Sequence, residues 1–184
     1  MIESLPPNDE DCNENIMSKL KKVGNKVKIY PLVKIIKPEV IEIGNNSMID
    51  DFTLINGGNG ITIGNYVHIA SFVSIIGGGQ LILGDYVVLA CGARILTATD
   101  TYYGGKRMSS ALPEDQRNVI RGKVIIERDA FIGTNVVVHP NVKIGEGAVV
   151  GSNSLVLKDV KPWSINVGSP CKRIGTRPPI RTTL

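Results

Sequence analysis

Two histidines, His68 and His139, are the side chains of this 184-residue sequence best suited to exchange a proton near neutral pH. An unperturbed imidazole changes its charge at about pH 6.5, so a neutral histidine can act as a general base. His68 directly precedes Ile69 of a regular aliphatic pattern, which predicts that its side chain points outward from a strand. His139 precedes Pro140, a placement typical of an exposed turn. We therefore favour His68 as a proton acceptor and interpret His139 as a surface residue.

The elements that position these residues follow from an aliphatic residue that recurs every six positions within groups of three. The recurring residues are Val23, Ile29, Ile35, Ile43, Ile49, Ile55, Ile63, Ile69, Ile75, Leu83, Leu89, Ile95, Ile126, Ile132, Val138, Ile144, Val150 and Val156. An α-helix has about 3.6 residues per turn, so residues spaced by six would not lie on one face of a helix. The pattern instead predicts a short strand followed by a corner.

Three such units predict one triangular coil, and stacked coils pair each strand with its copies above and below. Ile43 and Ile63 begin successive coils 20 residues apart, and glycine-rich segments at 56–59 and 76–79 supply the residues beyond three hexapeptides. Glycine permits the positive φ that a widened corner needs. The coil from Leu83 to Ile126 is much longer, which predicts an inserted loop at 96–121. The expected fold class is all-β, a parallel β-helix of about six triangular coils.

Composition agrees with this fold and disfavours several functions. Hydrophobic residues make up 42% of the sequence and aromatic residues 5%, and the 20 glycines disfavour a helical bundle. A net charge of +4 is too small for a dedicated nucleic-acid binder but suits an anionic small molecule. The sequence lacks an apolar run of about 18 residues, and its N-terminus is acidic and polar. We therefore expect a cytoplasmic protein with no membrane insertion and no nucleic-acid partner.

The cysteines do not indicate a disulfide framework or a metal site. There are three, Cys12, Cys91 and Cys171, and they lie 79 and 80 residues apart. An odd number at such spacing fits neither paired disulfides nor a compact thiolate zinc site. We expect three reduced thiols and no metal.

Three further features accompany the repeat, which covers about residues 23–177. One is a long loop from Leu96 to Arg121. Another is the stretch that begins with Ile69 and Ala70 and runs through TDTYYGG at 99–105. The segment VGSPCKRI at 167–174 is similar to a G-x-P-A-[KR] pattern, with Cys171 in place of the usual alanine. Together these features resemble the hexapeptide-repeat acyltransferases. Within that family they are similar to acyltransferases of nucleotide-linked amino sugars, such as the dTDP-4-amino-4,6-dideoxyglucose acyltransferases.

The resemblance implies a left-handed β-helix that transfers acetyl groups from acetyl-CoA. We expect N-acetylation of a nucleotide-linked amino sugar in surface polysaccharide biosynthesis. O-acetylation of a saccharide and a non-catalytic β-helix scaffold subunit remain alternatives. A γ-class carbonic anhydrase is disfavoured, because its metal needs three histidine ligands and the sequence has two.

One departure from the family concerns the base. Some relatives carry a catalytic histidine in a T-x-T-H-P-like loop motif, and Asp100 occupies the matching position in the segment TATD at 97–100. His68 is therefore the expected base, the alternative being a hydrogen bond across a subunit seam. Asp100 is expected to orient His68 or hold the acceptor, or else to cap its own turn. Tyr102 and Arg94 are expected to bind the sugar substrate.

The resemblance also implies a CoA site near the C-terminus, where cations would meet phosphates. The expected CoA-binding residues are Gly133, Gly151, Ser152, Lys158, Pro170, Lys172 and Arg173. The alternative for the lysines and arginines is a solvated basic tail.

Two outward apolar columns indicate a homotrimer with sites between its subunits. They contain Met48, Val88, Phe131 and Val149, and Leu54, Val137 and Leu155. Along the chain we expect an N-terminal segment at 1–22 with a short capping helix at 11–22. The β-helix domain then occupies 23–161, and a C-terminal segment on the CoA side occupies 162–184 and ends in an extended tail at 174–184.

Overall fold

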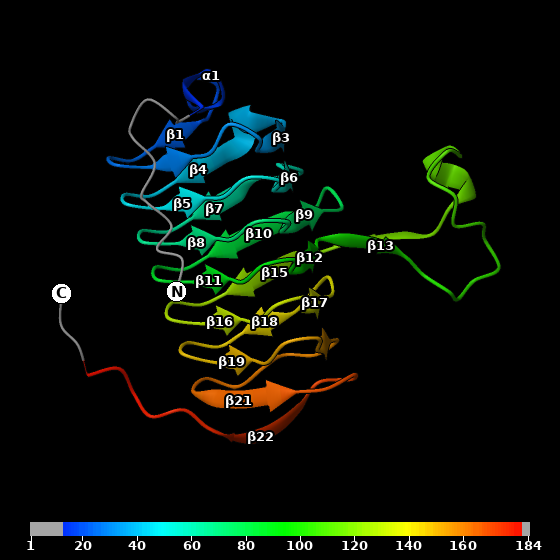
Figure 1. Ribbon diagram of the computed structural model, residues 1–184. Helices are drawn as coiled ribbons and strands as arrows, with labels where there is room; N and C mark the ends of the chain where they lie inside the picture. The colour runs from blue at the N-terminus through cyan, green and yellow to red at the C-terminus, as the bar shows by residue number, and fades with distance from the viewer. Residues whose placement is uncertain (1–12, 182–184) are drawn as a thin grey trace.

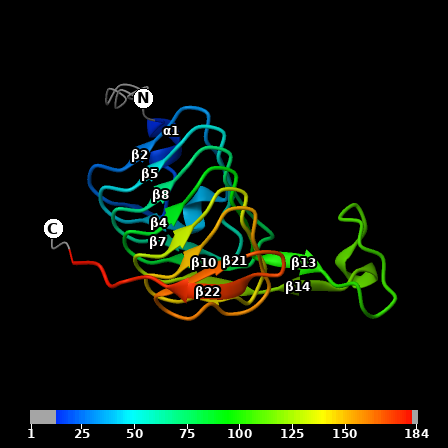
Figure 2. The ribbon, with the colours of Figure 1, turned by 60° about the horizontal axis from the view of Figure 1, so that its bottom comes forward.

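The computed structural model describes residues 13–181, which form a three-sided prism of short strands (Figure 1). The chain begins with α1 (Glu14–Met17) at one end of the prism and winds toward the other end coil by coil. The view in Figure 2 shows the coils stacked on one another with a long arm leaving one side. Each of the first six coils contributes one strand to each of three sheets, which we call sheets A, B and C.

The strands of each sheet follow one another along the prism. In spatial order, sheet A contains β1 (Lys22–Val23), β4 (Ile41–Ile43), β7 (Ile61–Ile63), β10 (Gln80–Leu83), β15 (Lys123–Ile126) and β18 (Lys143–Ile144). Sheet B contains β2 (Lys28–Ile29), β5 (Met48–Ile49), β8 (His68–Ile69), β11 (Val88–Leu89), β16 (Phe131–Ile132), β19 (Val149–Val150), β21 (Ser164–Val167) and β22 (Lys172–Thr176). Sheet C contains β3 (Lys34–Ile36), β6 (Leu54–Asn56), β9 (Ser74–Ile76), β12 (Arg94–Leu96), β17 (Val137–Val138) and β20 (Leu155–Val156). A short 3-10 turn, η2 (Pro38–Val40), lies between β3 and β4.

The hexapeptide register is confirmed by the strand pairing. Ile43 lies opposite Ile63 in a parallel ladder, as expected for coils of 20 residues. Because side chains alternate across a strand, the aliphatic residue of each hexapeptide points into the prism while its neighbour points out. Ile69 is accordingly fully buried and His68 is partly exposed. The expected all-β parallel β-helix is therefore confirmed, with its core along the axis of the prism.

The long fourth coil forms an arm rather than an irregular loop. Strands β13 (Ala98–Asp100) and β14 (Val119–Arg121) pair antiparallel, and residues 101–118 beyond them carry η3 (Glu114–Gln116). The arm projects away from the prism (Figure 1). Arg117 Nη2 lies 2.6 Å from Asp100 Oδ2, and Arg117 Nε lies 3.1 Å from Asp100 Oδ1. This bidentate pair ties the two sides of the arm together and raises the pKa of Arg117.

Both ends of the prism differ in detail from the expectation. The helix expected at 11–22 is limited to Glu14–Met17 in the described part, because Lys22 joins sheet A in β1; positions 11 and 12 lie outside the described residues. At the other end, Ile174 lies in β22 instead of a tail, since β22 pairs antiparallel with β21. This pairing satisfies backbone groups that the last coil would leave open at the edge of sheet B.

No helix within residues 13–181 is long and apolar enough to cross a bilayer.

Candidate functional site

His68 is held on the outer surface of sheet B by the alternation of β8. Its side chain is 38% exposed, and His68 Nε2 lies 3.0 Å from Asp50 Oδ2. Asp50 directly follows β5, the strand that pairs with β8 in the preceding coil. A carboxylate can only accept hydrogen bonds, so a neutral imidazole donates from Nε2 and keeps the lone pair of Nδ1. The pair can therefore orient a proton acceptor.

Asp50 was not predicted from the sequence as a partner of His68. The sequence does place it near His68, because it follows Ile49 of the aliphatic pattern and lies within one coil of His68. In the sheet, the residues directly opposite His68 are Met48 and Val88. Asp50 lies two residues beyond Met48, so it is a diagonal neighbour of His68 and is not found by comparing equivalent positions of the repeat.

The other residues expected at the acceptor site lie on a different face of the prism. Arg94 is exposed on β12 of sheet C, and its Nη1 donates to the carbonyl oxygen of Gly92 at 3.0 Å. Asp100 is bound to Arg117 in the arm, and Tyr102, further along the arm, is 79% exposed. Since His68 belongs to sheet B, one chain does not bring these groups to it. His139 follows β17 in sheet C and likewise lies on another face than His68.

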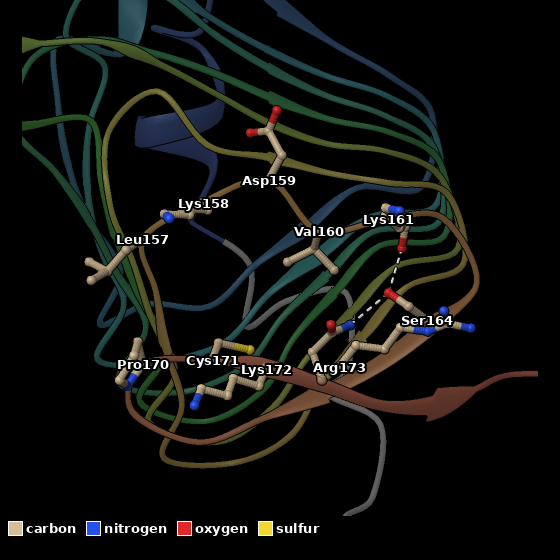
Figure 3. A pocket seen from close by; sticks show the side chains of 11 residues that line it. Leu157, Lys158, Asp159, Val160, Lys161, Ser164, Pro170, Cys171, Lys172 and Arg173 are labelled. Carbon is tan, nitrogen blue, oxygen red and sulfur yellow. Dashed lines mark hydrogen bonds between the residues drawn. The ribbon is translucent and has the colours of Figure 1, made fainter.

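A cavity of about 600 Å³ lies at the C-terminal end of the prism (Figure 3). Its lining residues are Leu157, Lys158, Asp159, Val160, Lys161, Ser164, Asn166, Pro170, Cys171, Lys172 and Arg173. In Figure 3, the segment that ends with Arg173 faces the segment from Leu157 to Lys161 across the opening. The cavity thus brings together Lys158, Pro170, Lys172 and Arg173 of the expected CoA-binding residues.

The charge of this cavity suits a phosphorylated ligand. It has four cationic side chains and one carboxylate, that of Asp159, so positive charge prevails. Apolar groups of Leu157 and Val160 line it as well. Burial raises the pKa of the Cys171 thiol, which keeps this group neutral to higher pH. The cavity can therefore hold a ligand that has both phosphates and apolar parts.

Gly133, Gly151 and Ser152 lie outside this cavity: Gly133 and Gly151 directly follow strands of sheet B, and Ser152 follows Gly151. A Cβ atom added to Gly133 would lie 2.8 Å from the backbone nitrogen of Ser152 and from the carbonyl oxygen of Val150. Stacking of the coils therefore requires glycine at position 133 whatever else the residue contacts. The described residues contain no group of three or more His, Cys, Asp and Glu side chains placed to hold a metal ion.

Comparisons with known proteins extend the similarity beyond the repeat. A family model described as bacterial transferase hexapeptide (six repeats) matches residues 123–158. The dTDP-4-amino-4,6-dideoxy-D-glucose acyltransferase of Escherichia coli is 36% identical over 158 residues, which cover 85% of this chain and 82% of that protein. The matching region therefore includes the coils around His68 as well as those matched by the family model.

Solved structures give the same result. AntD, an N-acyltransferase from Bacillus cereus, was solved with dTDP and 3-hydroxybutyryl-CoA; it matches with a TM-score of 0.85 and 36% identity, over 90% of this chain and 87% of that chain. A mutant of AntD in complex with dTDP-4-amino-4,6-dideoxyglucose and coenzyme A has a TM-score of 0.86 and 35% identity, over 90% and 89% of the two chains. The likeness thus extends over most of the chain.

Proposed function

Because the chain belongs to the family of hexapeptide-repeat acyltransferases, we propose that it transfers an acetyl group from acetyl-CoA to the amino group of a nucleotide-linked amino sugar. The observation that carries this proposal is the similarity along most of the chain to an acyltransferase of dTDP-4-amino-4,6-dideoxyglucose. AntD supports it, since that relative was solved with this nucleotide sugar and coenzyme A. The two substrates require a base near an amine and cations near phosphates, and the chain has candidates for both.

His68 supplies the base in this proposal. The sugar amine attacks the thioester carbonyl carbon, a C–N bond forms, the C–S bond breaks and the CoA thiolate leaves. The attacking nitrogen gives up one proton, which Nδ1 of the imidazole accepts. Asp50 holds the opposite ring nitrogen at 3.0 Å and stabilises the imidazolium that forms.

The cationic cavity supplies the site for the phosphates of acetyl-CoA. Lys172 and Arg173 extend from β22, and Lys158 faces them across the opening (Figure 3). Guanidinium and ammonium groups make charge-assisted hydrogen bonds to phosphate oxygens. The pantetheine arm would then run along sheet B past Gly151 and Ser152 toward Gly133, in the direction of the coil that carries His68.

The acceptor site is completed by a second subunit of a homotrimer. Phe131 in the apolar column of sheet B is 39% exposed, which is a large apolar surface for a side chain in the middle of a prism. The arm extends away from its own prism (Figure 1), and Tyr102 on the arm is 79% exposed. The Asp100 carboxylate is paired with Arg117 and its side chain is 16% exposed, so it reaches a neighbour together with that arginine. In the trimer, this arm places Asp100 and Tyr102 beside His68 of the adjacent subunit, with Arg94 at the same substrate site. A cytoplasmic location and a role in surface polysaccharide synthesis fit such a reaction.

An acceptor panel tests the proposed reaction. Release of the CoA thiol is followed with acetyl-CoA and, separately, with 3-hydroxybutyryl-CoA. The acceptors are nucleotide-linked amino sugars, the same sugars without the nucleotide, hydroxylated saccharides and simple amines. The proposal expects the highest kcat/KM with a nucleotide-linked amino sugar and acetyl-CoA, and an amide product that resists hydroxylamine. Turnover of saccharide hydroxyl groups alone would contradict it.

A further inference from the structure

An exposed pair of aromatic rings stands at the corner between sheets B and C. Phe52 is 55% exposed and Phe72 is 59% exposed. Their ring centroids lie 5.1 Å apart and the rings are inclined by 7°, so they are stacked. Because the two residues occupy the same corner of adjacent coils, the stack runs along the prism and presents ring faces in that direction.

The backbone of this corner does not favour phenylalanine. Phe52 has φ 63° and Phe72 has φ 64°, in the left-handed region that glycine and asparagine tolerate best. The same corner is formed by Gly92, Asn135 and Asn153 in the following coils. Large apolar rings at such positions are unfavourable to the backbone and remain in contact with solvent. Tyr66 and Tyr86 adopt the same backbone conformation at another corner, so what distinguishes Phe72 is how its ring is covered and not its backbone.

A second aromatic ladder at another corner provides a comparison. The rings of Tyr66 and Tyr86 are stacked at 5.2 Å, and the guanidinium carbon of Arg128 lies 5.7 Å from the centroid of Tyr86. The chain's own cation therefore covers the end of that ladder. Neither Phe52 nor Phe72 makes a cation–π contact within residues 13–181. The next position below Phe72 is Gly92, which has no side chain to cover the ring.

The corner at the level of Gly92 is occupied near the backbone by an amide of the next coil. Gly92 has φ 73°, and a Cβ atom added there would clash with Oδ1 of Asn135. The Asn135 amide therefore lies beside the Gly92 backbone, one coil beyond Phe72. A flat base that stacked on the exposed part of the Phe72 ring would turn its hydrogen-bonding edge toward this amide.

Phe72 is close in the chain to His68, the proposed general base. Phe72 follows His68 by four residues, which places their Cα atoms no more than about 14 Å apart. Phe52 follows Asp50 by two residues in the adjacent coil. The diphosphate and the sugar of one nucleotide sugar can span such a distance. The cationic cavity, by contrast, lies at the far C-terminal end of the prism, where the phosphates of CoA would be held.

We propose that the open face of Phe72 is the stacking platform for the pyrimidine base of the nucleotide-sugar acceptor, at the level of Gly92. This inference rests on the proposed function, because it assigns a position to the base of that acceptor. Stacking would place the amino sugar toward His68 and leave the edge of the base to the Asn135 amide. It makes Phe72 a specificity residue for nucleotide-linked over free amino sugars.

Calorimetric titration with dTDP tests the platform without requiring turnover. Phe72→Leu keeps an apolar side chain but loses the flat face, and we expect its Kd for dTDP to rise roughly tenfold. Phe72→Tyr keeps the face and should bind dTDP as the unaltered protein does. Tyr66→Leu is the matched control, since it removes a stacked and exposed ring from the other ladder. In the unaltered protein, the methyl resonance of thymine should also shift upfield because of the ring current of Phe72.

The same variants separate this inference from the proposed function. For Phe72→Leu we expect a higher KM for the nucleotide sugar, with unchanged KM for acetyl-CoA and unchanged turnover of the nucleotide-free amino sugar. If the unaltered protein acetylates a nucleotide sugar but Phe72→Leu binds dTDP equally well, the platform is refuted and the function stands. If Phe72→Leu instead raises the KM for acetyl-CoA or changes the oligomeric state in light scattering, the ring contacts CoA or another subunit and the inference is overturned. Tight dTDP binding that Phe72→Leu weakens, without acetylation of any nucleotide sugar, would refute the proposed function alone.

Discussion

His68 Nε2 lies 3.0 Å from Asp50 Oδ2, and the two residues belong to adjacent coils of the same sheet. The contact joins a potential proton acceptor to a carboxylate that can accept the hydrogen of its opposite ring nitrogen. It forms within one chain, whereas the proposed approach of Asp100 to His68 would require two chains. The orientation of the imidazole therefore does not depend on the arm.

Substitution of Asp50 should affect the rate of the reaction more than the binding of either substrate. Asp50→Asn removes the negative charge that stabilises an imidazolium, so we expect a lower kcat with unchanged KM for acetyl-CoA. The loss should be smaller than the loss of roughly 10² to 10⁴ expected when a general base itself is removed. Asp51→Asn is a matched control, because Asp51 accepts a hydrogen bond from the backbone nitrogen of Leu32 and does not contact the imidazole. Steady-state kinetics with equal effects of the two variants would contradict the role of Asp50.

Removal of a cation from the cavity should affect binding of acetyl-CoA. Lys172→Ala and Arg173→Ala each lose an exposed charge, so we expect KM for acetyl-CoA to rise by up to about fivefold, with little change in kcat. The effect should weaken at high ionic strength, because salt screens exposed charges. Lys19→Ala, which removes an exposed charge near α1 at the opposite end of the prism, should leave KM unchanged. A rise in KM for Lys19→Ala as large as that for Lys172→Ala would indicate a general effect of net charge.

The rate at which the Cys171 thiol is alkylated measures whether acetyl-CoA occupies the cationic cavity. Burial raises its pKa, so the reactive thiolate is scarce at neutral pH and alkylation should accelerate as the pH rises toward that raised pKa. In a variant with Cys12→Ser and Cys91→Ser, iodoacetamide can modify only Cys171. Acetyl-CoA at about ten times its Kd should slow this reaction by about tenfold, because Cys171 lines the cavity. Mass spectrometry follows the modification, and equal rates with and without acetyl-CoA would place CoA elsewhere.

The fold could be predicted from the sequence because the hexapeptide period repeats in nearly every coil. Residues such as Ile43, Ile63 and Leu83 occupy equivalent positions, and each repetition adds evidence for the same register. A parallel β-helix has few alternatives once that register is known. The ends were less predictable, since β22 reverses direction where the repeat stops and no periodic signal marks the turn.

The site could be predicted only where a family-like motif or an unusual residue type marked it. The basic segment around Lys172 and the outward position of His68 were visible in the sequence. Contacts between neighbouring columns were not, because they depend on side-chain direction across two coils. Asp50 beside His68 and Arg117 beside Asp100 both belong to this class. The stacked rings of Phe52 and Phe72 also escaped prediction, since they occupy corners and not the aliphatic positions.

Assembly should be visible in solution. Light scattering is expected to give a trimer, because the outward apolar columns of sheets B and C need cover and a heterologous contact between parallel prisms closes at three. Phe131→Glu should weaken the trimer, since it places a charge in the apolar column. Glu146→Gln, which lies outside both columns, is the control. A stable monomer of the unaltered protein at micromolar concentration would contradict both the trimer and a site shared between subunits.

A mixing experiment tests whether the site uses two chains. His68→Ala and Asp100→Ala subunits, each of which we expect to have little activity alone, are dissociated and reassembled together. Some interfaces in mixed trimers carry both native residues, so activity should partly return. Arg117→Ala is a second variant for this experiment. It removes the partner that lies 2.6 Å from the Asp100 carboxylate and leaves the carboxylate itself in the arm. No recovery in verified mixed trimers of well-folded parents would favour a site within one chain.

Turnover of dTDP-4-amino-4,6-dideoxyglucose by the unaltered protein and by His68→Ala, at saturating acetyl-CoA, tests the proposed reaction and its base together. The account predicts thiol release by the unaltered protein and a fall in kcat of roughly 10² to 10⁴ in the variant, with KM for acetyl-CoA and the trimer unchanged. Turnover by His68→Ala equal to that of the unaltered protein would contradict the assignment of His68 as the base. Lack of thiol release by the unaltered protein with any nucleotide-linked amino sugar would contradict the proposed function itself.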